Sequence, residues 1–178
     1  MDARSPTAWP TAIFDALTGL EVHQVAYVPD AGHRELIERC QGAEATGALA
    51  CVPLTTEEEG IALLAGAWLG GQRGVLLMQS SGLGNCVNML SLTRTCRFPL
   101  LMVITMRGQW GEFNPWQIPM GQATEPVLRL TESLVFHLDD PEQAGETVAS
   151  AGRMAFEGNT AAAVLISQRM IGVKTFEE

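Results

Sequence analysis

The chain has 178 residues and a net charge of −9, from 20 acidic and 11 basic residues. Its basic residues form no cluster, which argues against nucleic-acid binding because phosphate contacts need a basic face. Only 17% of the residues are charged, below the roughly 25% of typical soluble domains, and 18 are glycine, so we expect the chain to work inside an assembly. No run of 18 apolar residues occurs, so the sequence predicts no membrane span.

The chain length suits one domain. Its first ten residues contain no apolar signal core, and its four cysteines show neither a CxxC pair nor zinc spacing. These features predict a cytoplasmic protein with reduced thiols and no metal site formed by its cysteines. The cysteines are Cys40, Cys51, Cys86 and Cys96.

Apolar and helical segments alternate along the chain. In chain order, the predicted strands cover 23–29, 48–53, 74–79, 99–106, 134–138 and 161–167. The predicted helices cover 11–20, 33–40, 56–70, 86–96 and 141–158, and a further helix-like stretch precedes residue 134. Strands that are apolar throughout and separated by helices predict a parallel sheet covered on both faces. The expected fold is therefore α/β, a doubly wound, mainly parallel sheet of about six strands.

Ligands of doubly wound sheets bind outside the carboxyl ends of the strands. Four turns with unusual residues lie there: PDAGH (29–33), LTTEEE (54–59), QSSGLGN (79–85) and MRGQWGEFNPWQ (106–117). The segment 107–126 shows no clear period and is longer than the ordinary connection of about four to six residues. We therefore predict a functional loop in this segment.

Three consecutive glutamates open the helix predicted at 56–70, which looks apolar on all sides. Thr56 and Glu59 fit a capping box, as do Thr55 and Glu58, and acidic side chains in a first turn offset the helix dipole. Glu57 is followed at helical spacing by apolar residues, namely Ile61, Leu64, Ala65 and Trp68. Its carboxylate would therefore face the interior or an interface, and spacing alone leaves open whether it caps the helix or acts as a catalytic acid.

Three further features lie at the same edge of the predicted sheet. The turn SSGLGN (80–85) lets backbone N–H groups approach an anion or a flat ring, or is simply a tight turn that needs glycine. His33 ends the PDAGH turn and is either structural or part of a site. Arg107 follows the fourth strand and could pair with an anionic substrate.

The stretch LTTEEEGIALLAGAWLGGQRGVLLMQSSGLGN (54–85) resembles the pyrimidine-binding (Pyr) domain of thiamine-diphosphate enzymes. Members of that family carry a Glu nine residues before a Gly of the following helix, then a strand and an SGxGN-like turn. Glu57 stands nine residues before Gly66. YVPDAGH, MQSSGLGN, TMRG and PWQIPMG are most similar to sulfopyruvate decarboxylase alpha subunits and phosphonopyruvate decarboxylases, and the resemblance covers residues 10–176.

The resemblance implies a single Pyr domain over 1–178 in a thiamine-diphosphate-dependent 2-oxo acid decarboxylase, a carboxy-lyase. Glu57 is the implied acid that hydrogen-bonds N1′ of the cofactor's aminopyrimidine and moves a proton. The other implied cofactor contacts are Gly82, Leu83, Gly84 and Asn85. His33 is implied as a proton donor, and the implied substrate contacts are His33, Arg107, Gln79 and Gln117.

The sequence contains no G-D-G motif, with which the diphosphate-binding (PP) domain of the family holds Mg²⁺ and the diphosphate. The resemblance therefore implies a hetero-oligomer in which a separate beta subunit supplies the PP domain. The implied reaction converts 3-sulfopyruvate to sulfoacetaldehyde and carbon dioxide, with phosphonopyruvate decarboxylation or carboligation as alternatives. A non-catalytic regulatory subunit and a stand-alone nucleotide-binding domain remain alternatives from other classes.

Overall fold

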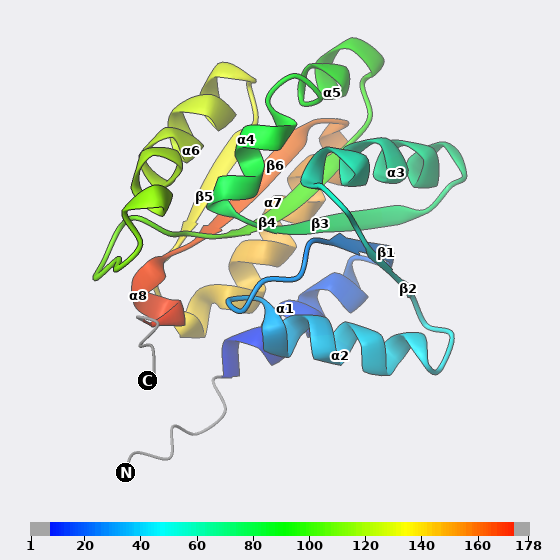
Figure 1. The fold of residues 1–178 in the computed structure, drawn as a ribbon. Coiled ribbons are helices and arrows are strands. Elements are labelled where there is room, and N and C mark those ends of the chain that lie inside the picture. The colour runs from blue at the N-terminus through cyan, green and yellow to red at the C-terminus, as the bar shows by residue number, and fades with distance from the viewer. Residues whose placement is uncertain (1–7, 173–178) are drawn as a thin grey trace.

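The computed structural model describes residues 8–172, which form one six-stranded sheet with helices on both faces (Figure 1). Every neighbouring pair of strands is parallel, in the order β2-β1-β3-β4-β6-β5. The strands are β1 (Val22–Tyr27), β2 (Ala50–Pro53), β3 (Arg73–Gln79), β4 (Leu100–Thr105), β5 (Leu134–Leu138) and β6 (Ala161–Ile166). The predicted doubly wound α/β fold is confirmed, and its sheet is parallel throughout.

Two helical layers enclose the sheet. One face is covered by α1 (Ala8–Gly19), α2 (Arg34–Glu44) and α7 (Ala144–Gly158), and the other by α3 (Glu57–Leu69), α4 (Leu83–Cys86), α5 (Ser91–Cys96) and α6 (Ile118–Leu130) (Figure 1). Successive strand residues point to opposite faces, so Val75 and Leu77 join the first core whereas Leu76 and Met78 join the second. None of the described helices combines the length and the apolar character needed to cross a membrane.

Short helical turns occupy several predicted loops. The remaining elements are the 3-10 helices η1 (Ser80–Gly82), η2 (Pro115–Gln117) and η3 (Pro141–Gln143), and α8 (Gln168–Ile171). The prediction of a turn at 80–85 is therefore wrong, since η1 and α4 occupy these residues. Gly82 accordingly has ordinary helical angles, φ −66° and ψ −24°. The helix predicted over 86–96 is interrupted, since α4 ends at Cys86 and α5 begins at Ser91.

The connection after β4 is shorter than predicted. Helix α6 occupies the predicted segment from residue 118 onward and continues past its end to Leu130. It has a proline within its first two positions, where the missing N–H costs no hydrogen bond. The irregular part spans 106–114 and ends at η2.

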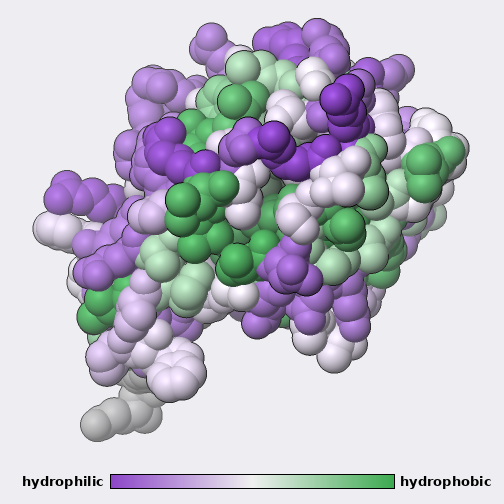
Figure 2. Space-filling view, turned by 90° about the horizontal axis from the view of Figure 1, so that it is seen from above, coloured by the Kyte–Doolittle hydropathy of each residue, from purple (hydrophilic) through white to green (hydrophobic). Residues whose placement is uncertain are grey.

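The start of α3 differs from the predicted capping box. Thr56 is the N-cap residue but its side chain makes no capping hydrogen bond, and the Glu59 carboxylate instead accepts from the Thr55 backbone N–H at 3.0 Å. The helix is also not apolar and buried on all sides, since Leu69 is 88% exposed. Figure 2 looks down on the side of the molecule formed by α3 to α6 and shows apolar patches between polar ones. Val87 and Leu130 from these segments are exposed as well.

The sheet order places a crevice between β1 and β3. The chain leaves β1 toward β2 on one side and leaves β3 toward β4 on the other side. Neighbouring connections that diverge in this way open a gap at the carboxyl ends of the strands, where doubly wound proteins bind ligands. The loop after β1 and the η1–α4 segment after β3 border this gap.

Candidate functional site

Glu57 is the first residue of α3, and its side chain is nearly buried, with 8% of the residue exposed. The Asn85 side chain donates a hydrogen bond from Nδ2 to Glu57 Oε2 at 2.7 Å. Within the described residues, Oε1 of Glu57 has no hydrogen-bond donor. The carboxylate is thus held by one oxygen, and the other remains available to a ligand.

Gly82 lies directly against this carboxylate. A Cβ at position 82 would lie 2.3 Å from Glu57 Oε1 and 2.4 Å from Cδ, so a side chain there would displace the glutamate. Of the other predicted cofactor contacts, Leu83 is fully buried in the core, whereas Gly84 and Asn85 are exposed. The structure therefore brings Glu57, Gly82 and Asn85 together and turns the Leu83 side chain inward.

Asp30, in the loop after β1, is the centre of a second group that sequence reasoning missed. Thr105, the last residue of β4, donates from its hydroxyl to Asp30 Oδ2 at 2.6 Å, and Gln79, the last residue of β3, donates from Nε2 to Oδ1 at 3.3 Å. A Cβ on Gly32 would lie 2.9 Å from both Asp30 Oδ2 and Thr105 Cγ2, so only glycine fits beside this contact. The predicted substrate contact Gln79 is thus part of a polar group at the crevice.

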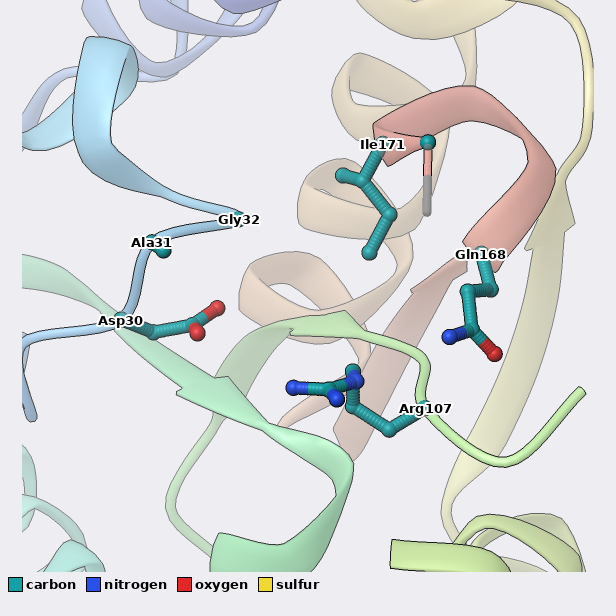
Figure 3. Close-up of a pocket in the computed structure, with 7 residues that line it drawn as sticks. Asp30, Ala31, Gly32, Arg107, Gln168 and Ile171 are labelled. Atoms are coloured by element: carbon teal, nitrogen blue, oxygen red, sulfur yellow. The ribbon is translucent and has the colours of Figure 1, made fainter. Parts of the chain in front are cut away.

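Arg107 follows β4 and lines a cavity of about 130 Å³ with Asp30, Gln168 and Ile171 (Figure 3). In Figure 3 the side chains of Asp30 and Arg107 extend from different segments toward the same space. Arg107 also forms a buried, two-pronged ion pair with Glu112, with Nε–Oε2 at 2.7 Å and Nη2–Oε1 at 2.5 Å. These hydrogen bonds are the main reason that the pKa of Glu112 falls to about 2. Arg107 therefore reaches the cavity as half of a neutral pair.

His33 lies beneath the loop after β1 and is fully buried. Its Nε2 is 3.0 Å from the Val103 carbonyl oxygen and 3.2 Å from that of Met78, so Nε2 carries the proton and donates to both. Burial lowers the pKa of the imidazole, and the neighbouring Asp30 carboxylate opposes this only in part. The ring is thus a neutral group that ties the loop to β3 and β4, and its contact with substrate stays a prediction.

Gln117, the last residue of η2, is half-buried, and its Oε1 is buried without a hydrogen-bond partner among the described residues. None of its hydrogen bonds reaches Glu57 or Asp30, so its predicted role also stays untested. The sequence analysis did not predict Gln168 as a site residue. Its position directly after the last apolar strand, where ligands of doubly wound sheets bind, was a signal that could have found it. Across residues 8–172, no three His, Cys, Asp or Glu side chains gather in a way that could hold a metal ion.

Comparisons with known proteins point to one family of decarboxylases. The chain is 35% identical over 156 residues to the sulfopyruvate decarboxylase subunit alpha of Methanothermobacter thermautotrophicus, an alignment that covers 87% of this chain and 93% of that one. It is 39% identical over 116 residues to the corresponding subunit of Methanococcus maripaludis, covering 65% and 70% of the two chains. No protein-family model matches.

Two longer proteins contain a similar region. The phosphonopyruvate decarboxylase of Streptomyces viridochromogenes is 42% identical over 118 residues, which cover 65% of this chain but 29% of that protein. The 2-oxoglutarate:ferredoxin oxidoreductase of Magnetococcus marinus shares the fold with a TM-score of 0.77 at 15% identity, over 92% of this chain and 29% of its own. The domain therefore occurs both as most of a subunit and as a minor part of a longer polypeptide.

Proposed function

Because the chain belongs to the family of sulfopyruvate decarboxylase alpha subunits, we propose that it is the alpha subunit of a thiamine-diphosphate-dependent carboxy-lyase that converts 3-sulfopyruvate to sulfoacetaldehyde and carbon dioxide. The observation that carries the proposal is the Glu57 carboxylate, held by Asn85 and fitted against Gly82 at the carboxyl edge of the sheet. Phosphonopyruvate is the alternative substrate, since a phosphonopyruvate decarboxylase shares 42% identity in the aligned region.

The residues around Glu57 fit one half of a thiamine-diphosphate site. Glu57 would hold the aminopyrimidine ring through Oε1 and move a proton there, while Asn85 keeps Oε2 in place. Gly82 leaves room for the Glu57 side chain, Gly84 stays a proposed cofactor contact, and Leu83 would support the segment from the core. When bound, the cofactor supplies the electron sink into which a 2-oxo acid loses carbon dioxide.

The cavity between Asp30 and Arg107 is the proposed place for the reacting end of the 2-oxo acid. Arg107 keeps N–H donors beyond the two that Glu112 accepts. Asp30 is oriented by Thr105 and Gln79, so its carboxyl group is fixed at the wall of the cavity. His33 would act as a neutral support of the Asp30 loop, and Gln117 remains a proposed polar contact.

We propose that a beta subunit supplies the PP domain and, through it, the site for Mg²⁺ and the diphosphate. Relatives named as alpha subunits imply a partner subunit, and the match to only 29% of a phosphonopyruvate decarboxylase supports a second functional part beyond this domain. All four cysteines are free, which supports a cytoplasmic location for the complex.

The test is co-expression with the proposed beta subunit and measurement of carbon dioxide release from 3-sulfopyruvate, phosphonopyruvate and pyruvate with thiamine diphosphate and Mg²⁺. Glu57→Gln keeps the size of the side chain but removes proton transfer, so kcat should fall at least about a hundredfold. Glu59→Gln is the matched control, because its side chain can still accept from Thr55 and should leave kcat unchanged.

Two outcomes would replace the proposal. Full activity of the Glu57→Gln complex would favour a non-catalytic regulatory subunit. Tight nucleotide binding by the isolated chain, with no carbon dioxide released from any 2-oxo acid by the complex, would favour a nucleotide-binding domain.

A further inference from the structure

Glu112 accepts hydrogen bonds from several parts of the irregular segment between β4 and α6. Its side chain is only 3% exposed and accepts hydrogen bonds from the Arg107 guanidinium, from the backbone N–H groups of Gly108 and Asn114 at 3.2 and 3.0 Å, and from Gln168 Nε2 at 2.9 Å. A carboxylate that accepts so many donors is ionised across the physiological pH range. The positive charge of Arg107 is therefore cancelled inside the chain before any substrate arrives.

The charges around the cavity argue against an ionic anchor for a doubly charged acid. Asp30 faces the cavity with hydrogen bonds from the neutral groups of Thr105 and Gln79. Together with the neutral Arg107–Glu112 pair, the wall thus carries a net negative charge. A substrate with two negative charges would meet repulsion here unless cationic groups came from elsewhere.

Two other arginines lie near this edge in the described part of the chain. Arg34 pairs with Glu38 at 3.1 Å. Arg169 stacks on the Trp110 ring, 4.0 Å from its centre, and lines a separate pocket with Asp139. Neither residue lines the cavity beside Asp30 and Arg107.

We propose that Arg107 and Glu112 act as a neutral positioning pair, so that Arg107 meets the acid as a hydrogen-bond donor and not as the ionic anchor of its sulfonate end. This inference rests on the proposed function. The free N–H edge of Arg107 would donate to the reacting end of the acid, while Glu112 fixes the guanidinium and the segment 106–114.

A double-mutant cycle in the αβ complex separates this role from direct ionic anchoring. The variants are Arg107→Gln, Glu112→Gln and the combination, assayed for kcat/KM on 3-sulfopyruvate at low and high salt. Glu112→Gln leaves the buried Arg107 charge unpaired and releases the guanidinium from its two-pronged contact, so kcat/KM should fall about tenfold. Arg107→Gln and the double variant also lose the donor to the acid, so kcat/KM should fall at least as far in both. The salt dependence of kcat/KM in the double variant should stay as in the wild type, because two neutral amides replace a neutral ion pair and the net charge of the cavity wall is unchanged.

An ionic anchor predicts a different pattern. Glu112→Gln would then release Arg107 and lower KM, whereas Arg107→Gln and the double variant would lose both activity and salt dependence, and this result would overturn the inference. Thermal unfolding of the same complexes gives a readout without turnover: the single variants should be less stable than the double variant. If the wild-type complex released no carbon dioxide, the proposed function would fail, while the thermal cycle would still test the pairing.

Discussion

Because Gly82 lies against Glu57, the substitution Gly82→Ala should lower the activity of the enzyme without lowering its stability. In Gly82→Ala, the new methyl group would lie 2.3 Å from Glu57 Oε1, 2.4 Å from Cδ and 2.6 Å from Cγ. Carbon and oxygen atoms that are not bonded normally stay about 3.5 Å apart, so the carboxylate has to move by about 1 Å. The backbone at position 82 has φ −66° and ψ −24°, which alanine adopts readily.

The expected result is a folded but poorly active enzyme. A displacement of about 1 Å in a group that moves protons costs about a hundredfold in rate, equivalent to about 2.7 kcal/mol in the barrier. The unfolding temperature should stay the same or rise, because the glutamate end can swing away and alanine favours helical backbone. The assay is kcat of the αβ complex with saturating thiamine diphosphate and Mg²⁺, together with thermal unfolding.

Gly42→Ala in α2 is the matched control, since a Cβ at position 42 meets no atom within 4 Å. It should leave kcat unchanged. A Gly82→Ala complex with activity within about threefold of the wild type would refute the claim that the position of Glu57 limits the reaction. A loss of folding in Gly82→Ala would refute the claim that the carboxylate alone absorbs the added methyl group.

Three further predictions concern the groups around Glu57 and Asp30. Asn85→Ala removes the 2.7 Å hydrogen bond to Glu57, so kcat should fall about tenfold, with KM for the 2-oxo acid nearly constant in steady-state assays. Gly32→Ala places a methyl group 2.9 Å from both Asp30 Oδ2 and Thr105 Cγ2, so KM should rise and thermal stability should fall; an unchanged KM would remove Asp30 from the substrate cavity. Because the pKa of Glu112 falls from 4.5 to about 2, its ionised form adds at most about 3 kcal/mol of stability above pH 4.5, which is lost as the pH falls toward 2. Denaturant unfolding at pH 3 and pH 6 should therefore show a smaller difference in Glu112→Gln than in the wild type.

The fold could be predicted because its signal is local. Apolar strands such as 161–167 and the helices between them carry the pattern of a buried parallel sheet in their own residues. The helical backbone at 80–85 was missed because its glycines suggested a special conformation, whereas Gly82 is needed for the space occupied by Glu57. The need for glycine at position 82 comes from Glu57, a residue 25 positions away, so no local sequence pattern could predict it.

The candidate site was predictable only where one segment contains it. Glu57 and the segment SGLGN (81–85) both lie within residues 54–85, and the structure brings Glu57 and Asn85 into contact. The contact between Asp30 and Thr105 joins residues 75 positions apart, so the sequence could not reveal it. The orientation of His33 could not be predicted either, because a turn residue can face outward or inward. Here tertiary packing turns the ring into the core.

The division between these two groups has a consequence for how such enzymes can diversify. The Glu57 support is encoded in one continuous stretch, from the start of α3 to Asn85. The cavity wall is assembled from Asp30, Arg107 and Gln168, which are spread over most of the chain. Under the proposed roles, mutations or exchanged loops after β1, β4 or β6 would alter which acid fits while the α3–β3–α4 block stays intact. A lineage built on this domain would then change its substrate while keeping the proposed proton-transfer site around Glu57.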